Sequence, residues 1–261
     1  MKTELERSEP ACPLSVVMPA YNEEASISEA VDDVRTHILD AVPGSELWVI
    51  DDGSRDRTAE ILDQKAAEEP RLRVIHQPNA GHGGALLNGL AHARGEWMLL
   101  VDSDRQIPLD GFASMWARRH GADAVFGQRD DRHDPLARRL VTAGLKLQVR
   151  LAFGARLEDP NAPFKLISRG LWERARTVIR RDCLIPSVFI AVYANRAGLR
   201  WHGVRVAYRK RSAGQTSLRK LTLLKFSVRS SMQLLAFRGV AIKAEVAPTL
   251  AAQVAPAAKR L

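Results

Sequence analysis

Short apolar runs alternate with amphipathic stretches over residues 14–128. Each run holds three to five residues, a length typical of strands that are buried on both faces of a parallel sheet. The predicted strands are 14–18, 47–50, 72–75, 97–101 and 124–126, and the predicted helices between them are about 23–40, 56–69, 83–94 and 110–120. This alternation favours an α/β fold with a doubly wound, mostly parallel sheet, in which ligands bind beyond the carboxyl ends of the strands.

The pattern is less regular beyond residue 128, where we predict helices over about 136–153, 170–179 and 187–197 and strands over 164–167 and 199–207. We place one globular domain at 14–217. Composition predicts that residues 1–13 and the Ala/Pro-rich residues 244–261 are disordered. Residues 218–243 form a predicted basic amphipathic helix, because apolar residues recur there at helical spacing. The apolar positions are Leu221, Leu224, Val228, Met232 and Leu235, and the flanking cations are Arg219, Lys220, Lys225, Arg229 and Arg238.

The positive charge of the chain is concentrated in one segment. The 261 residues carry a net charge of +9, yet residues 183–244 hold twelve Lys or Arg and no Asp or Glu. Such a segment is typical of a surface that meets the phosphates of a nucleic acid or of an anionic membrane, and a solvated basic surface is the simpler alternative. A nucleic-acid-binding module would interleave aromatic residues with the cations. Here the cations flank an apolar helical face, which favours a membrane interface over nucleic acid.

Cysteine usage and hydropathy bear on the compartment. Cys12 and Cys183 are far apart and have no metal-binding spacing, which is compatible with a reducing cytoplasm. No stretch reaches the ~18 uncharged apolar residues that a membrane-spanning helix needs, and the first 13 residues do not resemble a signal peptide. We therefore expect a cytoplasmic protein that lies on the membrane face and does not span the bilayer.

Polar clusters follow the first two predicted strands. The first strand leads into Pro19-Ala20-Tyr21-Asn22-Glu23 and the second into Asp51-Asp52-Gly53-Ser54. At strand ends, such carboxylates can accept hydrogen bonds from a nucleobase or a ribose, and a tyrosine ring can pack on the base. Helix capping and turn formation explain the same residues without a ligand.

Two carboxylates separated by one residue follow the fourth predicted strand, in Asp102-Ser103-Asp104-Arg105-Gln106. Hard oxygen ligands of this kind suit Mg²⁺ or Mn²⁺, which would neutralise the charge of a diphosphate leaving group. Upstream, the Gly-rich residues 79–85 open a predicted helix. They suit either a phosphate cradle or a tight packing turn.

These motifs occur in one order, with Gly127-Gln128-Arg129 as the fifth, and over about residues 14–217 they resemble the GT-A glycosyltransferases of family 2. The dolichol- and polyprenol-phosphate sugar transferases are the most similar branch. The resemblance implies a GT-A fold, a nucleotide-diphosphate sugar such as GDP-mannose or a UDP-sugar as donor, Mg²⁺ or Mn²⁺ as cofactor, and inversion at the anomeric carbon. It also implies polyprenyl phosphate as acceptor, and it leaves open a membrane subunit or a second copy of the chain as partner.

The resemblance assigns roles to matching residues. It places Asp102, Asp104 and Gln106 at the metal and Ser103 at the nucleotide, and it makes Asp104, Arg129 and Asp159 the catalytic candidates. The expected nucleoside pocket consists of Pro19, Tyr21, Glu23, Ile50 and Asp52. Phosphates are expected at Arg129 and Arg211, and Ser217 is a further substrate-binding candidate.

The acceptor half departs from the family pattern. Pro163 and Lys165 stand where the family has Gly and Arg, and Ser217 aligns with an expected Lys. An anionic lipid phosphate would attack without a general base, so the protein would act through positioning and charge neutralisation. The alternative is a soluble hydroxylated acceptor, such as a natural product or a glycan, for which Asp159 would be the base.

Overall fold

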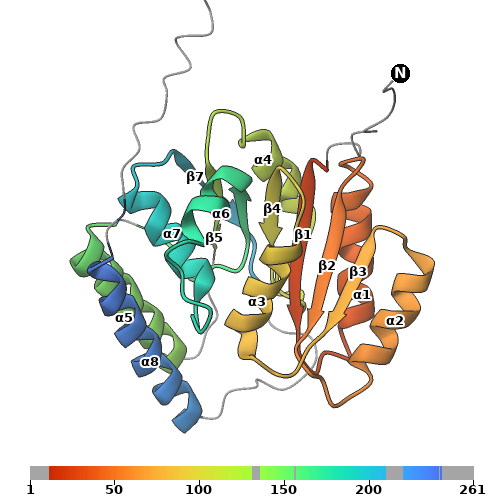
Figure 1. Cartoon of the computed structure of the whole chain (residues 1–261), viewed down its shortest axis with the longest axis horizontal. Helices are drawn as coiled ribbons and strands as arrows, with labels where there is room; N and C mark the ends of the chain where they lie inside the picture. The colour runs from red at the N-terminus through yellow and green to blue at the C-terminus, as the bar shows by residue number, and fades with distance from the viewer. Residues whose placement is uncertain (1–11, 131–135, 156, 210–219, 241, 243–261) are drawn as a thin grey trace, which may run out of the picture.

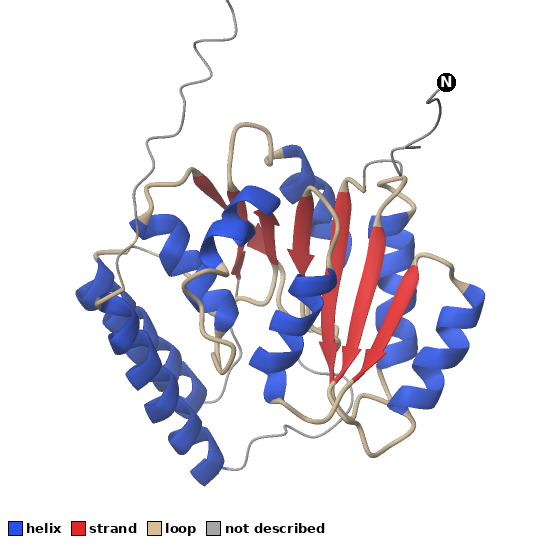
Figure 2. Ribbon diagram, viewed as in Figure 1, coloured by secondary structure: helices blue, strands red, loops and turns tan. Residues whose placement is uncertain are grey.

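The computed structural model describes residues 12–130, 136–155, 157–209, 220–240 and 242, and it contains a seven-stranded sheet with helices on both faces (Figures 1 and 2). The strand order is β3-β2-β1-β4-β6-β5-β7. The strands are β1 (Leu14–Ala20), β2 (Glu46–Asp51), β3 (Leu72–His76), β4 (Trp97–Leu100), β5 (Ala124–Arg129), β6 (Lys165–Ser168) and β7 (Trp201–Val206).

The predicted mostly parallel sheet is confirmed. Strands β1 to β4 pair in parallel, as do β5 and β7, whereas β6 runs antiparallel to both of its neighbours, β4 and β5. The carboxyl ends of β1, β2 and β4 therefore point to the same edge of the sheet, and the arrowheads of β1, β2 and β3 converge there in Figure 1. That edge carries the polar clusters that the sequence places after these strands.

Helices cover both faces of the sheet because side chains alternate along each strand. The described helices are α1 (Ile27–Val34), the π-helical turn η1 (Arg35–Leu39), α2 (Thr58–Glu68), α3 (Gly81–His92), the 3₁₀ turn η2 (Leu109–Gly111), α4 (Phe112–Ala117), α5 (Leu136–Phe153), α6 (Arg169–Ala175), α7 (Pro186–Arg196) and α8 (Lys220–Arg238). Val16 belongs to the hydrophobic core under α1, α2 and α4, and Val17 belongs to the core under α3, α6 and α7.

Helix α8 occupies the predicted C-terminal helix and lies beside α5 at one end of the molecule (Figure 1). Leu234 and Phe237 are buried against the body of the domain. On the opposite side of α8, Val228, Met232 and Leu235 are 52, 65 and 53% exposed. These three are positions of the predicted apolar face, so that face points away from the core. No helix in the described part of the chain has the length and apolar character to cross a bilayer.

A histidine bridges two carboxylates near the end of β3. His76 Nδ1 lies 2.9 Å from Asp51 Oδ2, and His76 Nε2 lies 3.0 Å from Asp63 Oδ1 on α2. The hydrogen bond with Asp51 is the main cause that raises the pKa of His76 above its usual value, and burial only partly opposes it. A raised folded-state pKa stabilises the fold at pH values below the unfolded pKa. That contribution disappears as the pH rises through the folded pKa.

We therefore expect His76→Gln to lower the free energy of unfolding more at pH 5.5 than at pH 8.5. The difference should be at most about 1 kcal/mol, because the imidazole is 41% exposed and solvent screens the pair. Urea unfolding at both pH values measures it. The exposed His120 supplies the control variant His120→Gln, which should change stability equally at both pH values. An equal loss at both pH values for His76→Gln would contradict the prediction.

Candidate active site

The loop after β2 presents a buried carboxylate at the sheet edge. Asp52 is 2% exposed, and its Oδ1 accepts hydrogen bonds from the Ala80 amide and from Gln77 Nε2, both at 2.7 Å. Asn79 Nδ2 donates to the main-chain oxygen of Asp52 at 2.8 Å. Asp52 thus holds the loop before α3, and the same carboxylate oxygen, Oδ1, accepts both of these hydrogen bonds.

The loop after β1 is tied to the same region. Asn22 has a positive φ of 53°, its amide donates to Ser54 Oγ at 2.9 Å, and its Oδ1 accepts from the Arg55 amide at 2.8 Å. Tyr21 and Glu23 are partly exposed beside it. These contacts join the loops after β1 and β2 directly, whereas the helices that follow, α1 and α2, have no side-chain hydrogen bond at their N-caps.

Two residues that were expected to contact the nucleoside are buried in the core of the domain. Pro19 is buried within β1, and Ile50 is completely buried, with its side chain close to Gly89 on α3. In this structure Pro19 and Ile50 are therefore core residues of β1 and β2, below the loops that carry Tyr21 and Asp52.

The loop after β4 carries the predicted metal ligands. Asp102 is one-third exposed at its side chain, Asp104 Oδ1 accepts from the Gln106 amide at 3.1 Å, and both carboxylates line one cavity. Ser103 between them is buried. The described residues contain no cluster of three or more His, Cys, Asp or Glu side chains arranged for a metal. The two carboxylates and the side-chain oxygen of Gln106 suit a hard divalent ion that takes its remaining ligands from water and a diphosphate.

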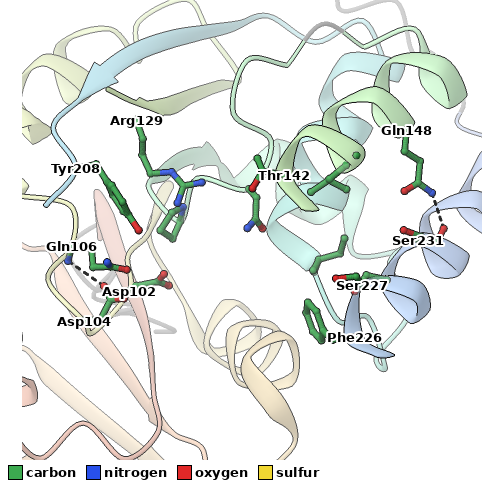
Figure 3. Close-up of a pocket in the computed structure, with 16 residues that line it drawn as sticks. Asp102, Asp104, Gln106, Arg129, Thr142, Gln148, Tyr208, Phe226, Ser227 and Ser231 are labelled. Carbon is green, nitrogen blue, oxygen red and sulfur yellow. Dashed lines mark hydrogen bonds between the residues drawn. The ribbon is translucent and has the colours of Figure 1, made fainter. Parts of the chain in front are cut away.

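That cavity has a volume of about 500 Å³ and extends from the β4 loop to α5 and α8 (Figure 3). Asp102, Asp104 and Gln106 lie at one end, next to Arg129 and Tyr208. The far wall combines neutral polar and apolar side chains, and Gln148 Nε2 donates there to the main-chain oxygen of Ser231 at 2.9 Å. The far wall contains Thr142, Leu145, Gln148, Ile185, Phe226, Ser227, Ser230 and Ser231.

Arg129 and Asp159 form a buried ion pair at the side of the cavity. Arg129 Nε and Nη2 donate to the two oxygens of Asp159 at 2.7 and 2.9 Å, and their side chains are 7 and 5% exposed. The guanidinium also lies 5.2 Å from the ring centre of Tyr208. Two catalytic candidates from distant parts of the sequence are therefore brought into direct contact.

Lys165 lies at the start of β6 and is completely buried. Its ammonium donates to the main-chain oxygen of Ala162. Burial lowers the pKa of Lys165 to about 7, although the negative charges of Asp159 and Asp102 act in the opposite direction. The residue that replaces the arginine of the family pattern is thus a buried amine behind the ion pair.

The Gly-rich loop is explained in part by close packing. A β-carbon at Gly83 would lie 2.2 Å from the main-chain oxygen of Cys183, and Gly81 has a positive φ of 77°. His82, at the N-terminus of α3, points to the loop of Asp102–Gln106, the metal loop. Its Nε2 lies 3.2 Å from Asp102 Oδ1. A tight turn is therefore required, and it also brings an imidazole to the candidate metal site.

Several residues of the site carry no recognisable signal in the sequence. The Gly-rich residues 79–85 stand out, but nothing singles out His82 among them. Tyr208 and the wall of α5 and α8 had no motif to indicate them. The predicted substrate-binding residues Arg211 and Ser217 lie outside the described residues.

Comparison with known proteins adds the family. Residues 15–174 match the profile described as Glycosyl transferase family 2. The undecaprenyl-phosphate 4-deoxy-4-formamido-L-arabinose transferase of Pseudomonas aeruginosa is 32% identical over 215 residues, which cover 81% of this chain and 62% of that protein. A dolichyl-phosphate beta-glucosyltransferase of Trichomonas vaginalis is 27% identical over 195 residues, which cover 67% of this chain and 58% of that protein. The chain thus spans less than two thirds of the length of these relatives.

A solved structure confirms the expected GT-A fold. Glucosyl-3-phosphoglycerate synthase from Mycobacterium tuberculosis, in complex with UDP, superposes with a TM-score of 0.66 at 23% identity. The match covers 88% of this chain and 82% of that one. At this identity the likeness concerns the arrangement of the strands and helices.

Proposed function

The chain belongs to glycosyl transferase family 2, and from that premise we propose that it transfers a sugar from a nucleotide-diphosphate sugar to a polyprenyl phosphate, with inversion at the anomeric carbon. One observation carries the proposal: the paired carboxylates Asp102 and Asp104 share a cavity with the Arg129 guanidinium. The undecaprenyl-phosphate and dolichyl-phosphate relatives support the acceptor class.

Asp102, Asp104 and Gln106 would hold Mg²⁺ or Mn²⁺, which would stabilise the negative charge on the departing diphosphate. The nucleoside would lie at the ends of β1 and β2, between Tyr21 and Asp52. Asp52 Oδ1 accepts hydrogen bonds from the loop before α3, and Oδ2 would accept one from the base or the ribose. Residues at the ends of β1, β2 and β4 would thus bind the donor and leave its sugar facing the cavity.

The acceptor oxygen would enter from the side of Arg129. Both oxygens of Asp159 already accept hydrogen bonds from that guanidinium, so Asp159 is poorly placed to take a proton from a hydroxyl acceptor. A phosphate acceptor needs no such base, since its oxygen is anionic at neutral pH. The ion pair therefore supports a lipid phosphate as acceptor.

A second candidate is a soluble hydroxylated acceptor. The neutral polar side chains Thr142, Gln148 and Ser227 on the far wall of the cavity favour it, because such groups can hydrogen-bond to sugar hydroxyls.

To test the reaction, the protein is incubated with undecaprenyl phosphate vesicles, Mn²⁺ or Mg²⁺ and a panel of UDP- and GDP-sugars. We expect release of the nucleoside diphosphate and formation of a lipid-linked sugar with at least one donor. Metal chelation should stop both. Absence of release with every donor would contradict the proposal.

We further propose that α5 and α8 rest on the cytoplasmic face of the membrane. Leu147 and Leu151 on α5 are 56 and 74% exposed, and they add to the exposed Val228, Met232 and Leu235 of α8. Exposed cations accompany both sets: Lys146, Arg150, Lys225 and Arg229. Exposed apolar side chains with neighbouring cations suit an anionic bilayer, where each Lys or Arg near the surface contributes ~1 kcal/mol.

Sedimentation with anionic liposomes should show binding that weakens as salt rises. Lys225→Gln with Arg229→Gln should reduce the bound fraction at low salt, and Met232→Gln with Leu235→Gln should reduce it at every salt concentration. Arg118→Gln with Arg176→Gln removes the same charge from exposed positions of other elements and is the control. If the wild type stays in the supernatant at low salt, the membrane proposal is wrong.

A further inference from the structure

Arg105 stands within the metal loop but points away from the cavity. It follows Asp104 directly and has a positive φ of 56°, a conformation that costs free energy for a residue with a β-carbon. Asp104 Oδ1 accepts from the Gln106 amide across it, which closes a tight turn with Arg105 at its centre. The orientation of Asp104 is therefore linked to the backbone conformation of Arg105.

Two carboxylates of α1 hold the Arg105 side chain. Its Nε donates to Asp33 Oδ2 at 2.7 Å, and its Nη1 pairs with Glu29 one helical turn earlier. A guanidinium is suited to such a fork because its N–H groups lie in fixed directions. The two acids thus fix the side chain from a helix outside the cavity.

The same loop is held at two other points. Asp102 contacts His82 of α3, and the main-chain oxygen of Gln106 accepts from the Arg209 amide at 2.8 Å. Arg105 supplies the third point, on the side of α1.

We propose that Arg105 is a positioning residue, whose clamp on Glu29 and Asp33 keeps the metal loop in the left-handed turn that presents Asp104 to the ion. The inference rests on the proposed function, because it assigns the ion to Asp102 and Asp104. Without the clamp, the turn relaxes to an ordinary φ and Asp104 loses its orientation. Groups that orient metal ligands typically change metal affinity 10- to 100-fold.

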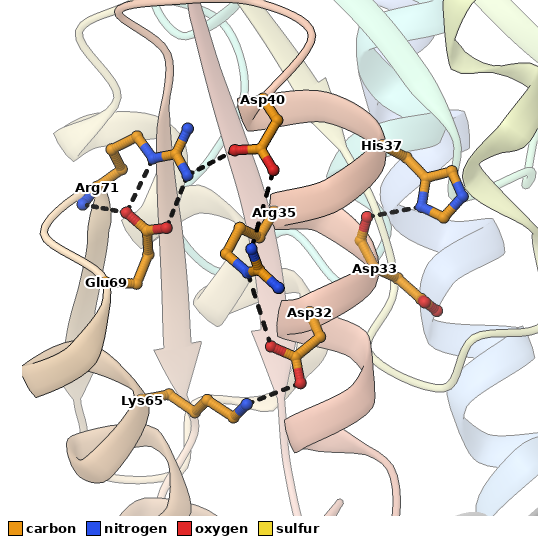
Figure 4. Close-up of polar contacts among 8 residues, drawn as sticks. All are labelled: Asp32, Asp33, Arg35, His37, Asp40, Lys65, Glu69 and Arg71. Atoms are coloured by element: carbon orange, nitrogen blue, oxygen red, sulfur yellow. Dashed lines mark hydrogen bonds and ion pairs between the residues drawn. The ribbon is translucent and has the colours of Figure 1, made fainter.

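The fold offers a matched control in Arg71 (Figure 4). Arg71 also pairs with two carboxylates, Asp40 and Glu69, and its side chain is 33% exposed against 32% for Arg105. In Figure 4 this network joins η1 to α2 and the start of β3 and includes no residue of the metal loop. Loss of Arg71 should therefore affect stability alone.

The test measures Mn²⁺ affinity by electron paramagnetic resonance in the presence of UDP, and separately GDP, together with the thermal midpoint. We expect Arg105→Ala to weaken Mn²⁺ binding at least about 10-fold. Arg105→Gly should bind better than Arg105→Ala, because glycine adopts the positive φ without a clamp. Arg105→Lys should rescue in part, and Arg71→Ala should bind within two-fold of wild type.

In turnover assays, Arg105→Ala should raise the metal concentration needed for half-maximal rate more than it lowers kcat at saturating metal. Wild-type affinity in Arg105→Ala, or an equal loss in Arg71→Ala, would overturn the inference while the proposed function stands. A wild type that binds no Mn²⁺ with either nucleotide would overturn both.

Discussion

Asp104→Asn and Asp102→Asn are each expected to lower sugar transfer at least about 10³-fold, which corresponds to roughly 4 kcal/mol of transition-state stabilisation. Each substitution removes one negative charge from the pair that faces the cavity. Asparagine keeps the shape and one oxygen, so the contact of residue 104 with the Gln106 amide can persist. The loss should therefore appear in catalysis and metal binding while the thermal midpoint changes little.

The nearby Asp110 provides the control. It is exposed, and its Oδ1 accepts from the Gly111 amide, so Asp110→Asn removes the same charge close to the loop. It should retain activity within about two-fold. Full activity in Asp102→Asn or Asp104→Asn, or in excess chelator, would remove the basis for the metal assignment.

Arg129→Ala is expected to have the second largest effect, on stability as well as turnover. The substitution leaves the Asp159 carboxylate buried without its guanidinium, and breaking a buried pair in this way costs about 3–5 kcal/mol. Turnover should fall too, because Arg129 lines the cavity beside Asp102. Arg129→Lys should recover only part of either quantity, since an ammonium cannot make two parallel hydrogen bonds.

A double variant separates the two effects. Arg129→Met with Asp159→Leu replaces the pair with apolar side chains, which should restore most of the free energy of unfolding and none of the turnover. Urea unfolding and the transfer assay measure the two quantities on the same preparations. If the double variant regains turnover, Arg129 serves the fold alone.

The strands were predictable because their apolar runs match buried parallel strands, and the site was predictable where it follows strand ends. The antiparallel direction of β6 was not predictable. A short strand buried on both faces has the same composition in either direction, and its neighbours β4 and β5 lie on both sides of it. Asp52, Asp102 and Asp104 were found because each lies within three residues of the end of an apolar run.

Contacts between distant segments could not be read from the sequence. The Arg129–Asp159 pair joins residues 30 positions apart, and nothing in the chain marks Lys165 as buried between β4 and β5. In helix α8, the spacing of apolar residues does not reveal which side packs on the domain. The spacing identifies the stripe of Val228, Met232 and Leu235, but the opposite side, with Leu234 and Phe237, is the one that packs on the domain.

The Arg105 clamp illustrates a further kind of information. The sequence assigns no role to this arginine, which lies between two candidate metal ligands. Its positive φ and its contacts with two acids of α1 direct it away from the cavity. Both features are properties of the folded chain, a backbone conformation and a contact between distant segments, so the sequence alone does not reveal them.

The measurement that tests the central claim most directly compares undecaprenyl phosphate with undecaprenol as acceptor, using the donor that gives nucleotide release. The two lipids differ only in the phosphate, whose oxygen needs no base. We predict that a lipid-linked sugar forms from the phosphate and not from the alcohol, and that the product carries the inverted anomeric configuration. Sugar transfer to a soluble hydroxylated acceptor with no product from undecaprenyl phosphate would contradict the account.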